Sequence, residues 1–217
     1  MRQLACAVGA WRQHVNGVDA PHDLRHWLTD RVSLTVKLIA HSAQFRVQRL
    51  TQQRAVCLAD EYAAIGLARR LCVQEREVLL VCDGAPVVFA HTVVPLQADA
   101  SDWPFFSSLG ERSLGTTLFG DPMVARGDLE YCRLAANHPL AVRARTAVGN
   151  STLPGPLYAR RCQFRRRNGV LLVTEVFLPA VADLTLKQSS VSPCRYVGGK
   201  RFNAEATGRA GIGGSRL

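Results

Sequence analysis

The stretch that decides the fold runs from Arg76 to Pro95 and reads Arg-Glu-Val-Leu-Leu-Val-Cys-Asp-Gly-Ala-Pro-Val-Val-Phe-Ala-His-Thr-Val-Val-Pro. Two apolar, β-branched segments flank Asp83-Gly84, which is the strongest short signal for a two-residue β-hairpin turn. With this pair at the centre of the turn, Cys82 faces Ala85. Counting outward from there places Arg76 opposite His91.

Alternation along the strands puts Arg76 on a face that is otherwise apolar. The residues predicted to share this face are Val78, Leu80, Cys82, Val87, Phe89 and His91. A guanidinium group cannot lose its charge, and burying it unpaired costs on the order of 3 to 5 kcal/mol, so an anion should meet it. That anion is either an Asp or Glu of the chain or the carboxylate of a substrate.

The composition favours one globular domain. The chain has 217 residues, of which 47% are hydrophobic and 20% charged, and a chain of this length can bury roughly 70% of its unfolded surface. The opening twelve residues are too short for a membrane span and lack a signal-peptide core, so we expect a cytosolic protein. Seven cysteines show neither zinc-ligand spacing nor a paired framework, and we interpret them as core residues: Cys6, Cys57, Cys72, Cys82, Cys132, Cys162 and Cys194.

The net charge of +10 raises the question of nucleic-acid binding. Part of this charge comes from the segment after Gln188, where five cations stand against one acid. Five further arginines fall on one predicted strand, where alternation sends them to both faces rather than into a single stripe. They are Arg160, Arg161, Arg165, Arg166 and Arg167. We therefore interpret the charge as a solvated basic surface.

Local patterns predict the other elements of the chain. Helices are predicted after Asp19-Ala20-Pro21, where the helix should end near Asp30, and after Ser33 and Ser113, which are capping residue types. The first two helices could together act as a cover, and the helix after Ser113 is a second candidate cover. Strands are predicted over residues 45–50, 124–134, 157–167 and 170–178, the last two joined at Asn168-Gly169. Residues 1–187 form the predicted domain, and residues 188–217, rich in Gly, Ser and Arg, a disordered tail.

A second charged residue, Glu175, lies in an apolar strand. Counting from Asn168-Gly169 as a two-residue turn puts Glu175 opposite Cys162 and diagonal to Arg160. The same face carries Val173, Phe177 and Phe164. Such a carboxylate is either satisfied internally, by Arg160 or Arg76, or accepts a hydroxyl or proton of a substrate. A one-residue bulge at the turn would point Glu175 the other way relative to its partner strand.

Several stretches, taken in order, resemble chorismate lyase. They are Val-Cys-Asp-Gly-x-Pro in the first hairpin, Ser113-Leu114-Gly115-x-x-Leu-Phe, Tyr158-Ala159-Arg160-Arg161 and Leu172-Val173-Thr174-Glu175-Val176-Phe177-Leu178-Pro179. The resemblance covers roughly residues 24 to 180. It implies an α+β fold, with a six-stranded antiparallel β-sheet and helical flaps that cover an internal site. It also implies removal of pyruvate from chorismate to give 4-hydroxybenzoate, the first committed step of ubiquinone biosynthesis, without metal or organic cofactor.

The resemblance implies roles for particular residues. Arg76 matches the carboxylate-binding Arg of the family, and Glu175 matches its hydroxyl-binding Glu. The backbone N–H groups of Leu34 and Leu114 match those that help to hold the ring carboxylate. Glu175 could be the base that takes the proton from C4, or could hold the 4-hydroxyl while the hydrogen passes intramolecularly to the enolpyruvyl group.

Chorismate carries a second carboxylate, on its enolpyruvyl group, and this needs a cation too. The family often has Arg where this chain has His91. Two residues are therefore candidates for the second carboxylate, a protonated His91 and Arg160.

Two other classes of function compete with an enzyme. Bacterial transcription regulators carry non-catalytic effector domains that resemble this fold and bind small acids, but the first twenty residues are too few for a helix-turn-helix. An RNA-binding tail would offer only Tyr196 and Phe202 for base stacking. We therefore expect a monomeric cytoplasmic enzyme that binds chorismate, with no nucleic-acid partner and no stable membrane insertion.

Overall fold

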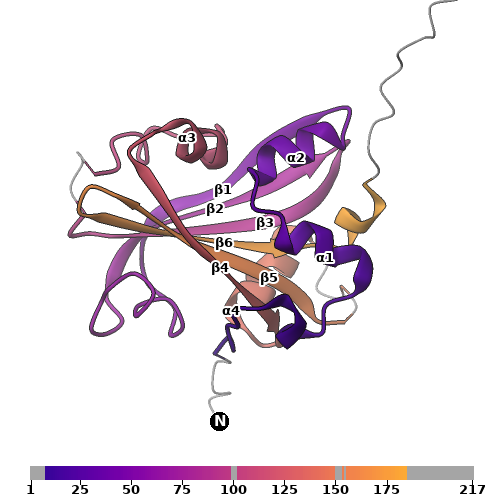
Figure 1. The fold of residues 1–217 in the computed structure, drawn as a ribbon, viewed down its shortest axis with the longest axis horizontal. Helices are drawn as coiled ribbons and strands as arrows, with labels where there is room; N and C mark the ends of the chain where they lie inside the picture. Colours follow the sequence, from indigo (N-terminus) through magenta and orange to yellow (C-terminus); the bar gives the residue numbers. More distant parts are fainter. Residues whose placement is uncertain (1–7, 99–101, 150–152, 154, 185–217) are drawn as a thin grey trace, which may run out of the picture. The chain divides into compact units, whose positions relative to one another are not determined.

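A single antiparallel sheet of six strands organises the protein, in the order β1-β2-β3-β6-β5-β4 (Figure 1). The computed structural model describes residues 8–98, 102–149, 153 and 155–184. The strands are β1 (Phe45–Val56), β2 (Cys72–Cys82), β3 (Ala85–Pro95), β4 (Val124–Leu134), β5 (Leu157–Arg166) and β6 (Gly169–Phe177). The predicted α+β fold is confirmed. The predicted tail, 188–217, lies outside the described residues.

Helices cover both faces of the sheet. They are α1 (His22–Thr29), α2 (Leu34–Ala40), α3 (Leu114–Gly120) and α4 (Pro139–Ala147), together with the 3₁₀ helices η1 (Val15–Val18) and η2 (Pro179–Asp183). Side chains of α1, α2 and α3 share a core with Val78 and Leu80 of β2. Those of α4 pack with Leu79 of β2 and Phe89 of β3 on the opposite face. Each face therefore has its own apolar core.

Helix α4 is not among the elements predicted above, because Asn137-His138-Pro139 is typical of a break after a strand. The helix begins at this very proline, which the first turn tolerates because its N–H would have no partner there. The side chain of His138 caps the helix by accepting a hydrogen bond from the backbone N–H of Leu140 at 3.2 Å. A proline after a capping side chain therefore starts a helix here.

Of the three predicted helix caps, only the one at Ser113 is confirmed. Ser113 caps α3, since its hydroxyl accepts from the backbone N–H of Thr116. Asp19 and Ser33 make no side-chain cap, and Asp19 instead adopts a left-handed conformation with φ 50°. Helix α1 nevertheless ends beside Asp30, as predicted.

The β2–β3 hairpin turns at Asp83-Gly84 and pairs Cys82 with Ala85, as predicted, but its register then shifts by one residue. Leu80 pairs with Val88 while Val81 pairs with Pro86, so Val87 is an extra residue in β3. Proline cannot donate to the hydrogen-bond ladder and is accommodated at such bulges.

A one-residue shift turns every later side chain of the strand to the other face. Arg76 therefore lies opposite Thr92, and His91 lies opposite Glu77. The prediction that Arg76 faces His91 and Phe89 is wrong.

The β5–β6 hairpin also differs from its predicted register, but with a milder result. The turn is formed by Arg167 and Asn168, with Arg167 at φ 53°, and Gly169 already pairs with Arg166. Glu175 is therefore directly opposite Arg160 rather than Cys162. Because the shift is two residues, Glu175 keeps its predicted face. Gly169 is needed for space, since a Cβ there would lie 2.6 Å from the Cβ of Asp102.

The cysteines divide by burial. Cys57, Cys82, Cys132 and Cys162 are free and buried, as predicted, whereas Cys72 at the start of β2 is exposed. Cys6 and Cys194 lie outside the described residues.

Candidate active site

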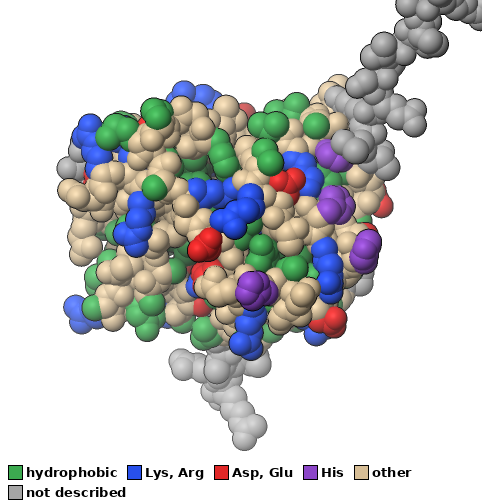
Figure 2. Space-filling model, viewed as in Figure 1, with side chains coloured by type: hydrophobic (Ala, Val, Ile, Leu, Met, Phe, Trp, Pro, Cys, Tyr) green, Lys and Arg blue, Asp and Glu red, His purple; other side chains and the backbone are tan. Residues whose placement is uncertain are grey.

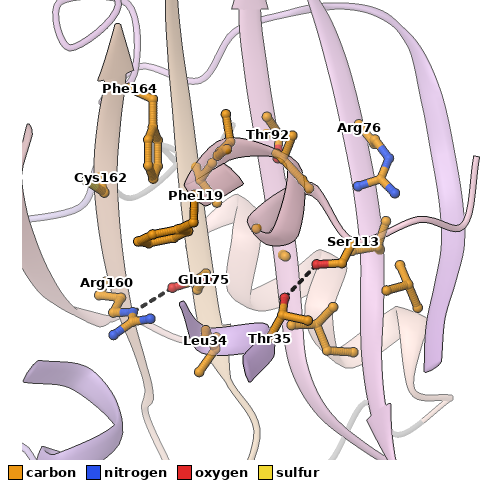
Figure 3. A pocket seen from close by; sticks show the side chains of 18 of the residues that line it. Leu34, Thr35, Arg76, Thr92, Ser113, Phe119, Arg160, Cys162, Phe164 and Glu175 are labelled. Carbon is orange, nitrogen blue, oxygen red and sulfur yellow. Dashed lines mark hydrogen bonds and ion pairs between the residues drawn. The ribbon is translucent and has the colours of Figure 1, made fainter. Parts of the chain in front are cut away.

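A cavity of about 50 Å³ lies between the sheet and helices α2 and α3 (Figure 3). Strands β1 to β6 all contribute to its wall, and the two helices contribute Leu34, Thr35, Leu114, Gly115, Leu118 and Phe119. The sheet side is mostly apolar. The charged side chains that line the cavity are Arg76, Arg126, Arg160 and Glu175. Three of the predicted site residues, Arg76, Arg160 and Glu175, thus meet in one place.

Arg76 projects from β2 into this cavity and is only 2% exposed. One terminal nitrogen, Nη2, donates to the carbonyl oxygens of Gly110 at 2.9 Å and Arg112 at 3.1 Å, while its Nε has no hydrogen-bond partner in the described part of the chain. Among the described residues no carboxylate pairs with it. Burial, and then the nearby charge of Arg49, lower the pKa of Arg76 to about 10. The anion predicted to meet Arg76 is therefore not an Asp or Glu of the described chain.

Glu175 lies on β6, two strands away from Arg76. Its Oε2 accepts from Nε of Arg160 at 2.5 Å, so Arg160 is the internal partner of this carboxylate. Nη1 of Arg160 also donates to three carbonyl oxygens at the end of α1, those of Trp27, Leu28 and Asp30, at 2.7 to 3.3 Å. Glu175 stays 20% exposed and lines the cavity. Arg160 thus fixes both the carboxylate and the helix that precedes α2.

His91 lies on the opposite face of the sheet and does not line the cavity. It is fully buried, with Nε2 2.9 Å from Oε1 of Glu61 and Nδ1 3.2 Å from Oε1 of Glu77. Burial alone would lower the pKa of His91, but the carboxylates of Glu61, Glu77 and Glu75 outweigh it and raise this pKa to about 10. The predicted His91 contact with substrate is wrong, because the bulge at Val87 turns this side chain away.

The acidic cluster around His91 is the one group of the described residues with the proximity of metal ligands: Glu75, Glu77 and His91. The guanidinium group of Arg143 already pairs with two of these carboxylates. Nη1 of Arg143, on α4, lies 2.9 Å from Oε2 of Glu75 and 2.7 Å from Oε1 of Glu77. We interpret this cluster as a buried ion network that joins α4 to the sheet.

The two flaps, α2 and α3, meet over the cavity. The hydroxyl oxygens of Thr35 and Ser113 are 2.6 Å apart (Figure 3). Gly115 allows this approach, since a Cβ there would lie 3.0 Å from Oγ1 of Thr35. Leu34 and Leu114 are the first residues of their helices, where a backbone N–H has no acceptor within the helix. Both line the cavity, so their predicted role in carboxylate binding has the right location.

Sequence reasoning missed Arg126 of β4. Simple alternation would place it with Asp128 and Glu130, facing solvent. A bulge between Arg126 and Leu129 pairs Arg126 with Phe164 and Leu129 with Cys162, which turns Arg126 to the cavity. The available signal was Gly127, because an isolated glycine in a strand marks a bulge.

Comparison with known proteins identifies the family. The chorismate lyase family model matches residues 7–186. This chain belongs to the chorismate lyase family. It is therefore an enzyme of the lyase class. A "Probable chorismate pyruvate-lyase" of Ralstonia nicotianae is 51% identical over 164 residues, 73% of this chain and 84% of that protein. Proteins of the same name from Cupriavidus metallidurans and Nitrosomonas europaea are 46% and 41% identical, over 78% and 81% of this chain and 80% and 96% of theirs.

Solved structures of lower similarity include PhnF from Mycobacterium smegmatis, with a TM-score of 0.48, 13% identity, and coverage of 70% of this chain and 65% of that one. The family membership follows from the sequence matches alone. No helix among the described residues has the length and apolar character to cross a membrane. On the face drawn in Figure 2, Lys and Arg side chains lie in several separate places. Arg160 and Arg161, which were predicted to belong to a solvated basic surface, are instead buried and paired with Glu175 and Glu130.

Proposed function

We propose that this protein removes pyruvate from chorismate and gives 4-hydroxybenzoate, the ring precursor of ubiquinone. The observation that carries this proposal is the buried Arg76, which has no carboxylate partner among the described residues and shares its cavity with Glu175. A bidentate guanidinium is the best geometric match for a carboxylate. The anion that Arg76 lacks would be the ring carboxylate of the ligand.

The placement of Arg76 and Glu175 suits a para-substituted ring. Their strands, β2 and β6, are separated only by β3, so the two backbones are about 10 Å apart. Their partners in β3, Thr92 and Ala90, are two residues apart, which offsets Arg76 and Glu175 along the strands. Both side chains reach into the space between. A ring with a carboxylate at one end and a hydroxyl at the other fits such a pair.

The proposed reaction needs little chemical assistance. The C3–O bond breaks with its electron pair going to oxygen, C4 loses a proton, and the enolpyruvyl methylene gains one. The atoms of chorismate divide completely between 4-hydroxybenzoate and pyruvate, and no oxidant is required. Because the ring becomes aromatic, we assign most of the catalytic effect to orientation of the substrate. Glu175 would hold the 4-hydroxyl as an acceptor.

Entry and exit require the flaps to move. A cavity of about 50 Å³ has room for only a few water molecules, whereas chorismate has ten carbon atoms. Opening of α2 and α3 would admit it, and closure would exclude water. Product release then becomes a candidate for the slowest step. A cytoplasmic location and a monomeric state stay predictions.

The test is direct. Purified protein is incubated with chorismate in the presence of a chelator, and 4-hydroxybenzoate and pyruvate are measured separately. Equal amounts of both products, unaffected by the chelator, are expected. Binding of chorismate without product formation would favour the non-catalytic binding domain. Activity that the chelator abolishes would contradict the cofactor-independent mechanism.

A further inference from the structure

The cavity contains more positive charge than Glu175 can balance. Three guanidinium groups, those of Arg76, Arg126 and Arg160, line it against one carboxylate. Two positive charges are therefore in excess. Chorismate, the substrate of the proposed function, carries two carboxylates, so the excess matches a dianion. The question is which two cations bind it.

Arg160 is already engaged. Its Nε is bonded to Glu175 and its Nη1 to three carbonyl oxygens at the end of α1. Arg76 and Arg126 differ from it, because each has a buried Nε to which no group of the described residues is hydrogen-bonded. A buried guanidinium N–H without an acceptor is costly. The guanidinium N–H donors that are available to an anion in this cavity are therefore those of Arg76 and Arg126.

The guanidinium group of Arg126 is also held in place by contacts with its neighbours. Its guanidinium lies 5.0 Å from the ring centre of Phe119, on flap α3, and 6.0 Å from that of Phe164, on β5. Its Nη1 donates to the carbonyl oxygen of Arg31, in the connection between α1 and α2. Arg126 therefore contacts the sheet and both flap regions at once. A group so placed would sense whether the flaps are closed.

We propose that Arg126 binds the enolpyruvyl carboxylate of chorismate and keeps this contact with pyruvate after the C3–O bond has broken. The assignment rests on the proposed function. In the cleavage step the oxygen of the broken bond leaves with the three-carbon fragment and takes on negative charge before its methylene carbon is protonated. A cation beside that fragment stabilises this charge. Arg76 keeps the ring carboxylate throughout.

The two arginines should then differ in what they recognise. 4-Hydroxybenzoate has the ring carboxylate but lacks the enolpyruvyl one. Arg126→Gln should raise KM for chorismate, or lower kcat/KM, by about 10- to 100-fold, as expected for loss of a charge-assisted hydrogen bond. Its affinity for 4-hydroxybenzoate should change less than about 3-fold. Arg76→Gln should weaken both. Inhibition by added pyruvate should also weaken in the Arg126 variant only.

The experiment compares steady-state kinetics with calorimetric binding of 4-hydroxybenzoate for the wild-type protein, Arg126→Gln, Arg126→Lys and Arg76→Gln. Arg165→Gln is the matched control, because it removes one positive charge from an exposed side chain of the neighbouring strand. Arg126→Lys keeps the charge and should recover part of kcat/KM. It also tests the assignment if the Gln variant does not fold.

Equal losses of chorismate turnover and 4-hydroxybenzoate affinity would overturn the inference, and so would unchanged kcat/KM in Arg126→Gln. Neither result would affect the proposed function, which fails only if the wild-type protein releases no pyruvate.

Discussion

The hydroxyl oxygens of Thr35 and Ser113 lie 2.6 Å apart and join flap α2 to flap α3. Thr35→Val keeps the shape of the side chain and removes this hydrogen bond, while Ser113 can still cap α3. Because one such bond contributes about 0.5 to 1.5 kcal/mol, we expect product to dissociate about 2- to 10-fold faster. Stopped-flow displacement of 4-hydroxybenzoate measures this rate. Thr117→Val is the control, since its hydroxyl bonds within α3. Equal dissociation rates of 4-hydroxybenzoate in the two variants would contradict a role of the Thr35–Ser113 hydrogen bond in holding the flaps closed.

A substitution at Gly115 tests the same closure of the flaps by crowding the contact between α2 and α3. A Cβ at this position would lie 3.0 Å from Oγ1 of Thr35 and 3.4 Å from Oγ of Ser33, so Gly115→Ala should push the flaps apart. Alanine favours helix by up to about 1 kcal/mol over glycine, so the melting temperature should not fall even as 4-hydroxybenzoate affinity weakens. Gly120→Ala, in the same helix, has open space around its Cβ and should leave affinity unchanged. A parallel effect in both variants would mean that helix propensity, not crowding, is responsible.

Glu175 has two possible roles that substitution separates. Gln keeps one acceptor oxygen but cannot take a proton, so a general base would lose about 10² to 10⁴-fold in rate. We expect a much smaller loss, because the structure holds Glu175 through Arg160 and the proposed reaction relies on orientation. Ala should be worse than Gln and also less stable, since it leaves Arg160 buried without its carboxylate. Single-turnover measurements, with folding verified by circular dichroism, avoid masking by product release. A Gln variant as inactive as Ala, yet still able to bind 4-hydroxybenzoate, would identify Glu175 as the base.

The His91 cluster should make stability depend on alkaline pH. The pKa of His91 is raised to about 10 in the folded protein, against about 6.5 in an unfolded chain. The folded state therefore binds this proton more tightly. The stabilisation is complete below about pH 6.5 and is lost as pH rises through 10. Urea unfolding of wild type should show a falling free energy of unfolding over this range.

His91→Gln should have a flatter pH dependence than wild type, whereas His22→Gln, at an exposed position, should follow wild type. The groups that face His91 are Glu61, Glu75 and Glu77, with Arg143 bridging the last two from α4. The same slope in wild type and His91→Gln would show that the imidazole does not carry the effect.

The sequence was sufficient for the sheet and for much of the site, because the strongest signals are local. Asp83-Gly84 located the central turn, and the alternation of Glu175 with Val173 and Phe177 located the carboxylate on the cavity face. What alternation alone could not supply is the position of bulges. Val87 reversed the predicted relation of Arg76 to His91, and the bulge after Arg126 brought an unforeseen cation into the cavity.

Each bulge lies next to a residue that indicates it locally, but an argument from strand periodicity alone does not use that residue. Pro86 cannot donate to the ladder of a central strand, and Gly127 approaches the carbonyl oxygen of Gln163, which a Cβ would meet at 3.1 Å. The pairing of Arg160 with Glu175 was one of the predicted alternatives, but the carbonyl partners of Arg160 could not be predicted, for another reason. Its carbonyl acceptors lie about 130 residues away in the chain and come close only when α1 packs on the sheet.

Glu75, Arg76 and Glu77 follow one another in β2, so the pleat sends the middle side chain to the cavity and its two neighbours to the opposite face. On that opposite face the carboxylates of Glu75 and Glu77 lie close to His91 and Arg143, whereas the cavity face holds an excess of guanidinium groups. The sheet thus separates carboxylates on one face from guanidinium groups on the other. Because the carboxylates of Glu75 and Glu77 are held by cations on the other face, Arg76 pairs with no carboxylate of the described residues and remains available to an anionic ligand.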